Sequence, residues 1–446
     1  MRHILIIGAG SREASIVEAA KQHRAKGRGV KLISVLGSNG AFDADPSITK
    51  IHFKKVSEVV EWAKSKKVTL VYVGSENDIA RGFTEALTIE GIPVCAPTQG
   101  AFNNTEAWKH RMKRVADMGG IGTAPYEIAR SLEEAMAIAT SRLGDGDIDR
   151  DVCKFSGLAS GKGVNDNVRS EEDARRFLRA IYEDNIFGKP PAGESHTVVF
   201  EDFLGGPLMS EYSVHAVARH EDFVLLPTSR DRKKNDRGEM TGGMGCYMPV
   251  PGCGKAFQNY VTVAFVAPYL HILAQVLSTP FVGILYPGLI GNVVECMLWL
   301  LEVNCRGGGP ELELHALWLQ DVLIDLINWA AVGGQKPQIP KLEEAVVCFV
   351  AASQEYPKKG HEPVLITGLE AANEVEGVQI NHGGTVFHDG KYYTQKDGSR
   401  ILTVNVKAPN VAEARERGLY VLGRIKFGDE APQFVRSIGE EAVSSE

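Results

Sequence analysis

The chain has 446 residues, of which 44% are hydrophobic and 24% charged, a composition typical of a globular protein of about three domains. A net charge of -7 and a pI near 6.0 argue against nucleic acid as a partner, so small molecules are the expected ligands. Seven cysteines form no C-x-x-C pair and no cluster with zinc spacing, and the N-terminus lacks a signal-peptide pattern. We therefore expect a reduced, cytoplasmic chain.

The first hundred residues alternate strands and helices, as in a parallel α/β domain. Strands are expected at 3–8, 30–37, 69–74 and 92–97, with helices near 12–26, 56–66 and 79–90. Gly8 and Gly10 form the turn after the first strand, where free helix amides can bind an anion. A dinucleotide fingerprint would need a glycine in place of Glu13, so a nicotinamide cofactor is the weaker alternative.

The rest of the chain predicts two further α/β units and a smaller α+β domain. A helix-rich stretch at 104–119 leads to a unit at about 123–193, whose helix is capped by Ser170. The apolar stretch 281–303 is long enough to suggest a membrane span, but Pro287 and Glu295 favour a pair of core strands. Glycines and prolines at 331–341 predict a linker.

The stretch "CKFSGLASGKGV", residues 153–164, suggests a loop that lies against phosphates. It is not a Walker loop, because Gly157 is one residue too close to Gly161 and Gly163 replaces the metal-binding hydroxyl. Lys154, in an apolar strand just before the loop, is expected to point into a cleft and neutralise nucleotide phosphates. The alternative is a solvated charge at a strand edge.

Three other motifs carry candidate chemistry. In "LLEVNCRGGGPE", Glu302 and Asn304 lie two apart on a predicted strand, so both face one side and offer oxygen ligands suited to magnesium. Arg306 follows on the same alternation and suits phosphoryl transfer. "VVFEDFLGG" places Glu201 at a strand end, where it can meet an adenine, and "MTGGMGCYMP" offers a glycine cradle for an anion or a substrate carboxylate. No arrangement of an enzyme nucleophile stands out.

In their order and spacing, these motifs resemble those of the phosphoribosylamine-glycine ligase family of ATP-grasp enzymes. Members carry similar strings: a lysine-led loop ending in A-G-K-G-V, then T-G-G-M-G-A-Y, then E-F-N-C-R. The resemblance implies an ATP-grasp fold of the α/β and α+β multidomain class. It implies a Rossmann-like domain at 1–103, an ATP-grasp domain at 104–335 with a lid at about 123–193, and an α+β domain at 336–446.

The resemblance also implies a reaction, in which ATP phosphorylates glycine and the amine of 5-phosphoribosylamine attacks the acyl phosphate. Lys154 and Arg306 would be catalytic, and Glu302 and Asn304 would bind Mg²⁺ or Mn²⁺. The implied ATP contacts are Lys154, Ser156, Gly157, Leu158, Ala159, Ser160, Gly161, Lys162, Gly163, Glu201, Asp202, Phe203, Leu204 and Glu211. The implied substrate contacts are Gly8, Gly10, Ser11, Arg12, Glu76, Gly242, Gly243, Met244 and Gly245.

The sequence departs from the family pattern mainly where the amine and amino acid are handled. Ser11 replaces a glycine, Ala14 a histidine and Gly309 an aspartate, and the stretch before "TGGMG" is about three residues short. Aligning the family's S-K-A-F-T-K with "TEAWKH" puts Glu106 at a phosphate-binding lysine, for which Lys109 is a substitute.

These departures leave alternatives open. They are a ligase with a different amine or carboxylate substrate and a catalytically silent ATP-binding relative. An NAD-dependent oxidoreductase is a further alternative, suggested only by "GAG" after the first strand. We expect a monomer or homodimer that binds neither nucleic acid nor membrane.

Overall fold

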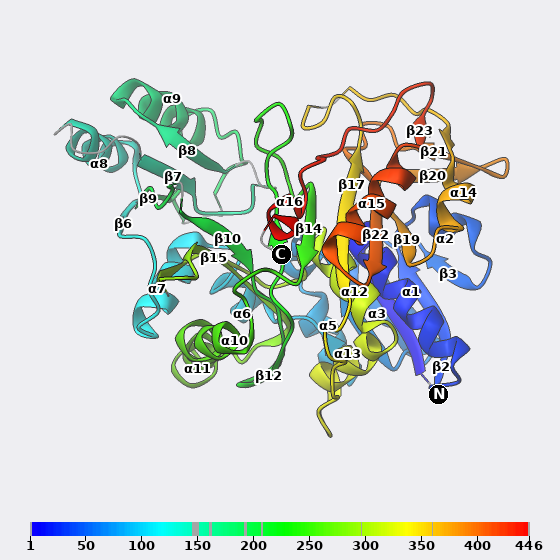
Figure 1. Cartoon of the computed structure of the whole chain (residues 1–446). Coiled ribbons are helices and arrows are strands. Elements are labelled where there is room, and N and C mark those ends of the chain that lie inside the picture. The colour runs from blue at the N-terminus through cyan, green and yellow to red at the C-terminus, as the bar shows by residue number, and fades with distance from the viewer. Residues whose placement is uncertain are drawn as a thin grey trace.

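The computed structural model describes residues 2–144, 151–159, 163–190, 194–206, 208–295, 297–358 and 360–444. Figure 1 shows the N-terminal and C-terminal parts of the chain side by side, with the lid region standing apart from both. The predicted fold class is confirmed: a parallel sheet forms the N-terminal domain and the other sheets contain antiparallel pairs.

The N-terminal domain is a parallel sheet in the order β3-β2-β1-β4-β5, covered by helices. The strands are β1 (Arg2–Ile7), β2 (Val30–Leu36), β3 (Ile48–Ile51), β4 (Leu70–Val73) and β5 (Val94–Cys95). The helices are α1 (Ser11–Ala25), α2 (Gly40–Ala44), α3 (Val56–Ser65), α4 (Glu76–Ala80), α5 (Phe83–Ile89) and α6 (Gln99–Asn103). The predicted alternation is confirmed, but β3 and α2 were missed. The helix expected at 79–90 is divided by Gly82, whose φ of 81° is left-handed.

The next region forms a four-stranded antiparallel sheet, here called the lid sheet, in the order β6-β9-β7-β8. Its strands are β6 (Tyr126–Ala129), β7 (Asp151–Phe155), β8 (Val164–Val168) and β9 (Val198–Asp202). Helices α8 (Leu132–Gly144) and α9 (Glu171–Tyr182) pack together and share a separate apolar core with it. Ser170 caps α9 as predicted, by accepting from the Asp173 N–H. The phosphate-loop candidate therefore joins two antiparallel strands, unlike a Walker loop.

Helix α7 (Lys109–Met118) precedes the lid sheet, and a central antiparallel sheet follows it. The strands of the central sheet are β10 (Ser210–Ser213), β11 (Ala216–Arg219), β12 (Asp222–Leu225), β15 (Val282–Asn292) and β16 (Met297–Asn304). The apolar stretch at 281–303 is thus a pair of antiparallel core strands, as predicted. Two helices, α12 (Glu311–Leu319) and α13 (Val322–Val332), follow β16.

One helical run in the described residues, Lys255–Val276, is long and apolar enough to cross a membrane by length and composition alone. It consists of α10 (Lys255–Val261), η1 (Thr262–Val266), α11 (Ala267–His271) and η2 (Ile272–Val276), where η marks a π-helical turn. One side of the run packs into the core through Phe265, Tyr269 and Leu273. A core helix meets the same criteria, so the run is weak support for a membrane span.

The C-terminal sheet has the order β13-β14-β17-β22-β19. The strands of this part are β13 (Arg230–Asp231), β14 (Gly245–Met248), β17 (Ala345–Ala352), β18 (Ile366–Thr367), β19 (Val378–His382), β20 (Thr385–His388), β21 (Lys391–Thr394), β22 (Arg400–Ala408) and β23 (Lys426–Phe427). The helices are α14 (Leu369–Asn373), α15 (Val411–Leu422) and α16 (Glu440–Val443). Strands β13 and β14 come from the expected ATP-grasp segment, so the domain boundaries stay a prediction.

Candidate active site

Lys154 and Glu201 form a buried ion pair on the lid sheet. Lys154 Nζ lies 2.8 Å from Glu201 Oε2 and donates to the main-chain oxygen of Leu301 on β16 at 3.4 Å. A second cation, Lys113 of α7, lies 3.1 Å from the same carboxylate and is fully buried. Burial lowers the pKa of Lys113 to about 8, although Glu201 opposes the shift. Lys154 thus points into the interior between the lid sheet and β16, as predicted, and is not a solvated edge charge.

Lys109, the first residue of α7, is a cation with no paired carboxylate. Among the described residues, no carboxylate lies within 4 Å of its ammonium, whereas Lys113 and Lys154 are both paired. Burial lowers its pKa, and Glu302, Lys154, Glu106 and Glu201 are near enough to act on it electrostatically. Lys109 is therefore the lysine of α7 available to a phosphate.

Glu302 and Asn304 lie on one side of β16, as the alternation predicts, with Asn304 Nδ2 donating to Glu302 Oε1 at 3.3 Å. Burial raises the pKa of Glu302, but Lys233, Lys109 and Lys154 outweigh it and lower the pKa to about 2. Within the described ranges, no three His, Cys, Asp or Glu side chains could hold a metal. An ionised carboxylate beside an amide oxygen fits a hard cation whose other ligands come from phosphates and water.

Arg306 follows β16 and forms ion pairs with two carboxylates from different parts of the chain. Its Nε donates to Glu76 Oε2 at 3.1 Å, and its Nη2 lies 2.8 Å from Glu106 Oε1. Glu106 also accepts from the Cys305 N–H at 3.1 Å, so it holds the main chain as well as the guanidinium. Burial raises the pKa of Glu106, while Arg306 opposes the shift. Glu106 is thus a partner of Arg306, and that Lys109 substitutes for the expected phosphate-binding lysine stays a prediction.

The turn after β1 brings Gly8, Gly10, Ser11 and Arg12 to the carboxyl end of the parallel sheet. Glu13 Oε2 accepts from the Gly10 N–H at 2.7 Å. This amide is therefore already hydrogen-bonded to a carboxylate and is not free for a dinucleotide pyrophosphate. Arg12 donates to the main-chain oxygen of Gly307 at 3.1 Å and lies 3.7 Å from Glu76. Burial raises the pKa of Glu76, but Arg306 and Arg12 lower it to about 2. Glu76 therefore joins the first turn to Arg306.

The glycine motif 242–245 leads into β14, with Gly242 and Gly243 before the strand. The Gly242 N–H donates to the Tyr356 hydroxyl at 2.8 Å. A side chain on Gly243 would come within 2.7 Å of the Gly309 main-chain oxygen, so a glycine is required for this close approach. Met244 is fully buried in the apolar core, which leaves only its main chain available to a substrate. Gly245 begins β14.

The described part of the phosphate-loop candidate packs tightly. Ser156 is buried and accepts from the His110 N–H at 3.1 Å, which fixes the loop to α7. A side chain on Gly157 would meet the Phe155 ring at 2.6 Å, and one on Gly163 would meet Ala159 at 2.7 Å. Leu158 packs against the apolar core, while Ser160, Gly161 and Lys162 lie outside the described residues.

The remaining predicted ATP contacts surround β9 and β10. Asp202 ends β9 and lies 2.6 Å from Arg142 of α8, an ion pair within the lid region. Phe203 and Leu204 follow directly in the chain. Glu211 of β10 lies 3.2 Å from Lys233, whose Nζ is 3.7 Å from Glu302. The roles of these four residues toward ATP stay predictions.

Sequence reasoning missed three cations of the site: Lys113, Lys233 and Arg400. Lys113 lies one turn after Lys109, which was a usable signal, because residues four apart share a helix face. Lys233 lies in the short stretch "RDRKKNDRGEM", which contains several Lys and Arg residues, so the sequence does not show which of them reaches the site. Arg400 begins β22, far from every motif in the sequence, and its Nη1 donates to the Gly309 main-chain oxygen at 2.7 Å.

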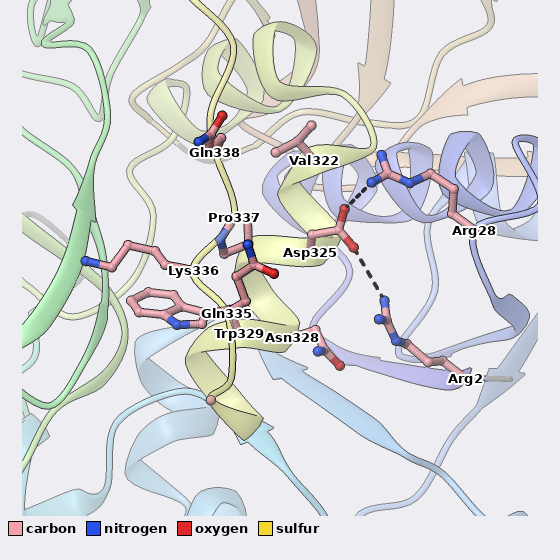
Figure 2. A pocket seen from close by; sticks show the side chains of 11 residues that line it. Arg2, Arg28, Val322, Asp325, Asn328, Trp329, Gln335, Lys336, Pro337 and Gln338 are labelled. Carbon is pink, nitrogen blue, oxygen red and sulfur yellow. Dashed lines mark ion pairs between the residues drawn. The ribbon is translucent and has the colours of Figure 1, made fainter.

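A cavity of about 480 Å³ lies away from these residues, at the amino end of β1. Figure 2 shows Arg2 and Arg28 reaching Asp325, with Trp329 and Lys336 on the other side. The motif residues lie beyond the carboxyl end of β1. The cavity therefore lies at the opposite end of the parallel sheet from them. Asp325 already pairs with both arginines, so nothing in the cavity indicates a ligand.

Comparisons with known proteins agree with this arrangement. Family models described as the N domain, the ATP-grasp (A) domain and the C domain of phosphoribosylglycinamide synthetase match residues 2–103, 107–312 and 346–439. A phosphoribosylamine-glycine ligase of Mesorhizobium japonicum is 32% identical over 449 residues, covering 100% of this chain and 99% of the relative. The chain belongs to the phosphoribosylamine-glycine ligase family.

Other members of the family support the assignment. A phosphoribosylamine-glycine ligase of Rhodopirellula baltica is 30% identical over 437 residues and covers 95% of this chain and 94% of the relative. The crystal structure of a phosphoribosylamine-glycine ligase from Thermotoga maritima matches with a TM-score of 0.78 at 24% identity, over 98% of this chain and 100% of the other. At that identity the match shows the fold, and it confirms the predicted ATP-grasp architecture. Family membership and Glu13 together remove the support for the oxidoreductase alternative.

Proposed function

We propose that this chain joins glycine to 5-phosphoribosylamine at the expense of ATP, forming glycinamide ribonucleotide, ADP and phosphate. The observation that carries the proposal is that Lys109, unpaired, lies near Glu302 while Arg306 is fixed two residues beyond Asn304. Cations, a hard-oxygen pair and a planar donor are thereby gathered at one end of β16. Family members named as phosphoribosylamine-glycine ligases support the choice of reaction.

In this proposal ATP lies between the lid sheet and β16. Lys109 and Lys154 neutralise its phosphates, the loop 156–163 covers them, and residues 201–204 with Glu211 hold the adenosine. Glu302 and Asn304 would hold Mg²⁺ or Mn²⁺, whose positive charge would offset that of the phosphates.

Arg306 donates to the phosphoryl group as it moves to the glycine carboxylate, and the amine then attacks the acyl phosphate. The chain positions the groups and stabilises charge, and it needs no covalent nucleophile of its own. A cytoplasmic location and a monomeric or dimeric state remain predictions within the same proposal.

The test is release of ADP and phosphate from ATP, magnesium, glycine and freshly generated phosphoribosylamine. We expect turnover that needs both substrates and is abolished in Glu302→Ala. Glu295→Ala, which removes an exposed carboxylate from the turn between β15 and β16, is the matched control and should keep full activity. Absence of ADP release under all conditions would instead indicate a silent ATP-binding relative.

A second candidate is a ligase of the same family with a different amine or carboxylate. Gly309 favours it, because an acidic side chain usual in the family is absent at a point that Arg12 and Arg400 both contact. ADP release that depends on neither glycine nor phosphoribosylamine would favour this candidate.

A further inference from the structure

His110 is the second residue of α7, and both its main chain and its ring contact the loop that follows β7. The His110 N–H donates to Ser156 Oγ at 3.1 Å, and His110 Nδ1 lies 2.7 Å from the same oxygen. Ser156 is only 1% exposed, and its own N–H donates to the main-chain oxygen of Thr197 at 2.8 Å. One buried hydroxyl of the loop therefore makes two contacts with the first turn of α7.

The first of these contacts supplies a cap that the sequence around the start of α7 does not provide. The first amides of a helix have no acceptor within the helix, and Trp108, at the N-cap position, accepts no hydrogen bond through its side chain. Ser156, which lies 46 residues further along the chain, accepts from one of these amides instead. The first turn of α7, which carries Lys109, is thus held by the phosphate-loop candidate.

The second contact fixes both the direction of the hydroxyl hydrogen and the tautomer of the ring. Burial, with further effects of Arg111, Arg114 and Arg130, lowers the pKa of His110 to about 4, so the ring is neutral near pH 7. Among the described residues, the Ser156 hydroxyl is hydrogen-bonded only to the main-chain amide and the ring of His110. The amide can only donate, so the hydroxyl hydrogen finds an acceptor at Nδ1, and the ring hydrogen is on Nε2.

Ser156 is therefore left with no donor for a phosphate, because a hydroxyl carries a single hydrogen and Nδ1 accepts it. The contact instead joins two groups that are expected at the phosphates. One is the loop, whose described ends are linked by the Phe155 N–H, which donates to the main-chain oxygen of Gly163 at 2.7 Å. The other is Lys109, the residue before His110, on a helix that also contacts β9 and β16 (Figure 1).

We propose that His110 and Ser156 are positioning residues for the nucleotide, and that their hydrogen bond holds the loop after β7 and Lys109 in fixed relative positions for binding the phosphates. The inference rests on the proposed function for the place of the phosphates. The pair acts on the nucleotide through the loop and through Lys109, and not by touching it. Its effect is therefore on the binding of the triphosphate and not on that of the adenosine.

The test measures binding of MgATP and of adenosine to the whole chain by calorimetry. In Ser156→Ala and in His110→Ala we expect MgATP to bind about tenfold more weakly, because a buried hydrogen bond is lost and its partner is left unpaired. The double variant should bind MgATP no more weakly than Ser156→Ala alone, since both substitutions break the same contact. Adenosine, which has no phosphate, should bind as it does to the wild type.

Ser170→Ala is the matched control. Ser170 also lies in the lid region and also accepts from a helix amide, the Asp173 N–H at 3.1 Å, but it is exposed and caps α9. Its loss should leave the affinity for MgATP unchanged. His110→Asn, whose amide oxygen lies near the position of Nδ1, should keep most of the affinity, whereas His110→Gln, whose amide group extends toward the position of Nε2, should lose it.

Unchanged affinity for MgATP in Ser156→Ala would overturn the proposal, and so would losses that add in the double variant. An equal loss of affinity for adenosine would assign the contact to general stability and would also overturn it. If the alanine variants do not fold, equal affinities of His110→Asn and His110→Gln for MgATP would overturn it. Binding is read without glycine or the amine, so a wild type that binds MgATP but forms no glycinamide ribonucleotide would contradict the proposed function and leave this inference standing.

Discussion

The two halves of the proposed active site are built differently. The nucleotide half is defined by Lys109, Lys113, Lys154, Glu201, Lys233 and Glu302, and the substrate half by Gly8–Arg12, Glu76, Gly242–Gly245, Gly309 and Arg400. In the nucleotide half most side chains lie on helices or strands, and Lys113 and Lys154 share the carboxylate of Glu201 at 3.1 Å or less. In the substrate half most residues lie in turns, and many contacts are made by glycine main chain.

The difference bears on some of the departures from the family pattern, and not on Glu106, which lies beside Arg306. A buried lysine that loses its carboxylate leaves an unpaired charge, so changes in the nucleotide half are costly. A hydrogen bond made by a residue's main-chain atoms can persist when the side chain of that residue is replaced. Ser11 and Gly309, both departures from the family pattern, lie in the substrate half, where the structure accommodates them.

Replacing Lys109 with methionine tests the nucleotide half most severely. We expect kcat/KM for ATP to fall by about 10²–10³-fold, because the variant loses the cation that we propose neutralises the phosphates. Lys255→Met is the control, since Lys255 is also the first residue of its helix but is exposed in α10. A wild-type kcat/KM in Lys109→Met would mean that Lys154 alone neutralises the phosphates.

Replacing Glu106 with glutamine tests the link between the two halves. We expect kcat to fall by about 10–10²-fold with little change in the KM for ATP, because Arg306 loses a charged partner that orients it. Steady-state kinetics at saturating glycine and amine measure this.

Asp321→Asn is the control for Glu106→Gln, because it removes a buried carboxylate that pairs with Arg28 at the other end of the sheet. It should reduce stability without changing kcat. A rise in the KM for ATP alone in Glu106→Gln would contradict the role assigned to Glu106.

Restoring the family's aspartate at Gly309 tests the tolerance of the substrate half. The space is adequate, since an added side chain makes only ordinary contacts with Arg12 and Arg400. We expect the melting temperature to stay within a few degrees of the wild type, with roughly a two- to tenfold change in the KM for the amine, since the new carboxylate pairs with Arg400. An unfolded variant would show that the departure is required for packing.

Acidification tests His215, which is buried and accepts from the Gly308 N–H at 3.2 Å. Burial, with a further effect of Arg306, lowers its pKa to about 3, against 6.5 for an unperturbed histidine. Between pH 6.5 and 3 the unfolded chain therefore binds a proton that the folded chain excludes, and stability falls as the pH falls. We expect a loss of about 2 kcal/mol between pH 6.5 and 5, measured by urea unfolding.

The variant His215→Gln keeps a hydrogen-bond acceptor but does not titrate. Its stability should depend less steeply on pH over the same range. An identical slope in both proteins would assign the acid sensitivity to other groups.

Much of the nucleotide half could be predicted because its signals are local. Glu302 and Asn304 share a strand face, and Lys154 stands next to the loop it serves. The strand β8 was missed because "VNDNV" has a polar centre and no clear alternation, and its place is decided by pairing with β7. Lys113 was missed because its partner Glu201 lies far along the chain.

The substrate half could be predicted only through the resemblance to the family. Its residues are joined by contacts between distant turns, such as Arg400 with Gly309 and Glu76 with Arg306. No periodicity connects these segments. The partner of Glu106 could not be predicted, because an alignment by residue type cannot show that its side chain turns toward Arg306.

Because β14 pairs with β17, we expect the linker after α13 to be dispensable as a covalent connection. Met248 pairs with Val346 and Gly245 with Phe349, so a strand from before the linker is hydrogen-bonded to the sheet that follows it. A chain cut by protease within 333–344 should stay together as two associated pieces. The piece after the cut, made alone, would expose the edge of β17 and should recover its fold only when the piece carrying β14 is supplied.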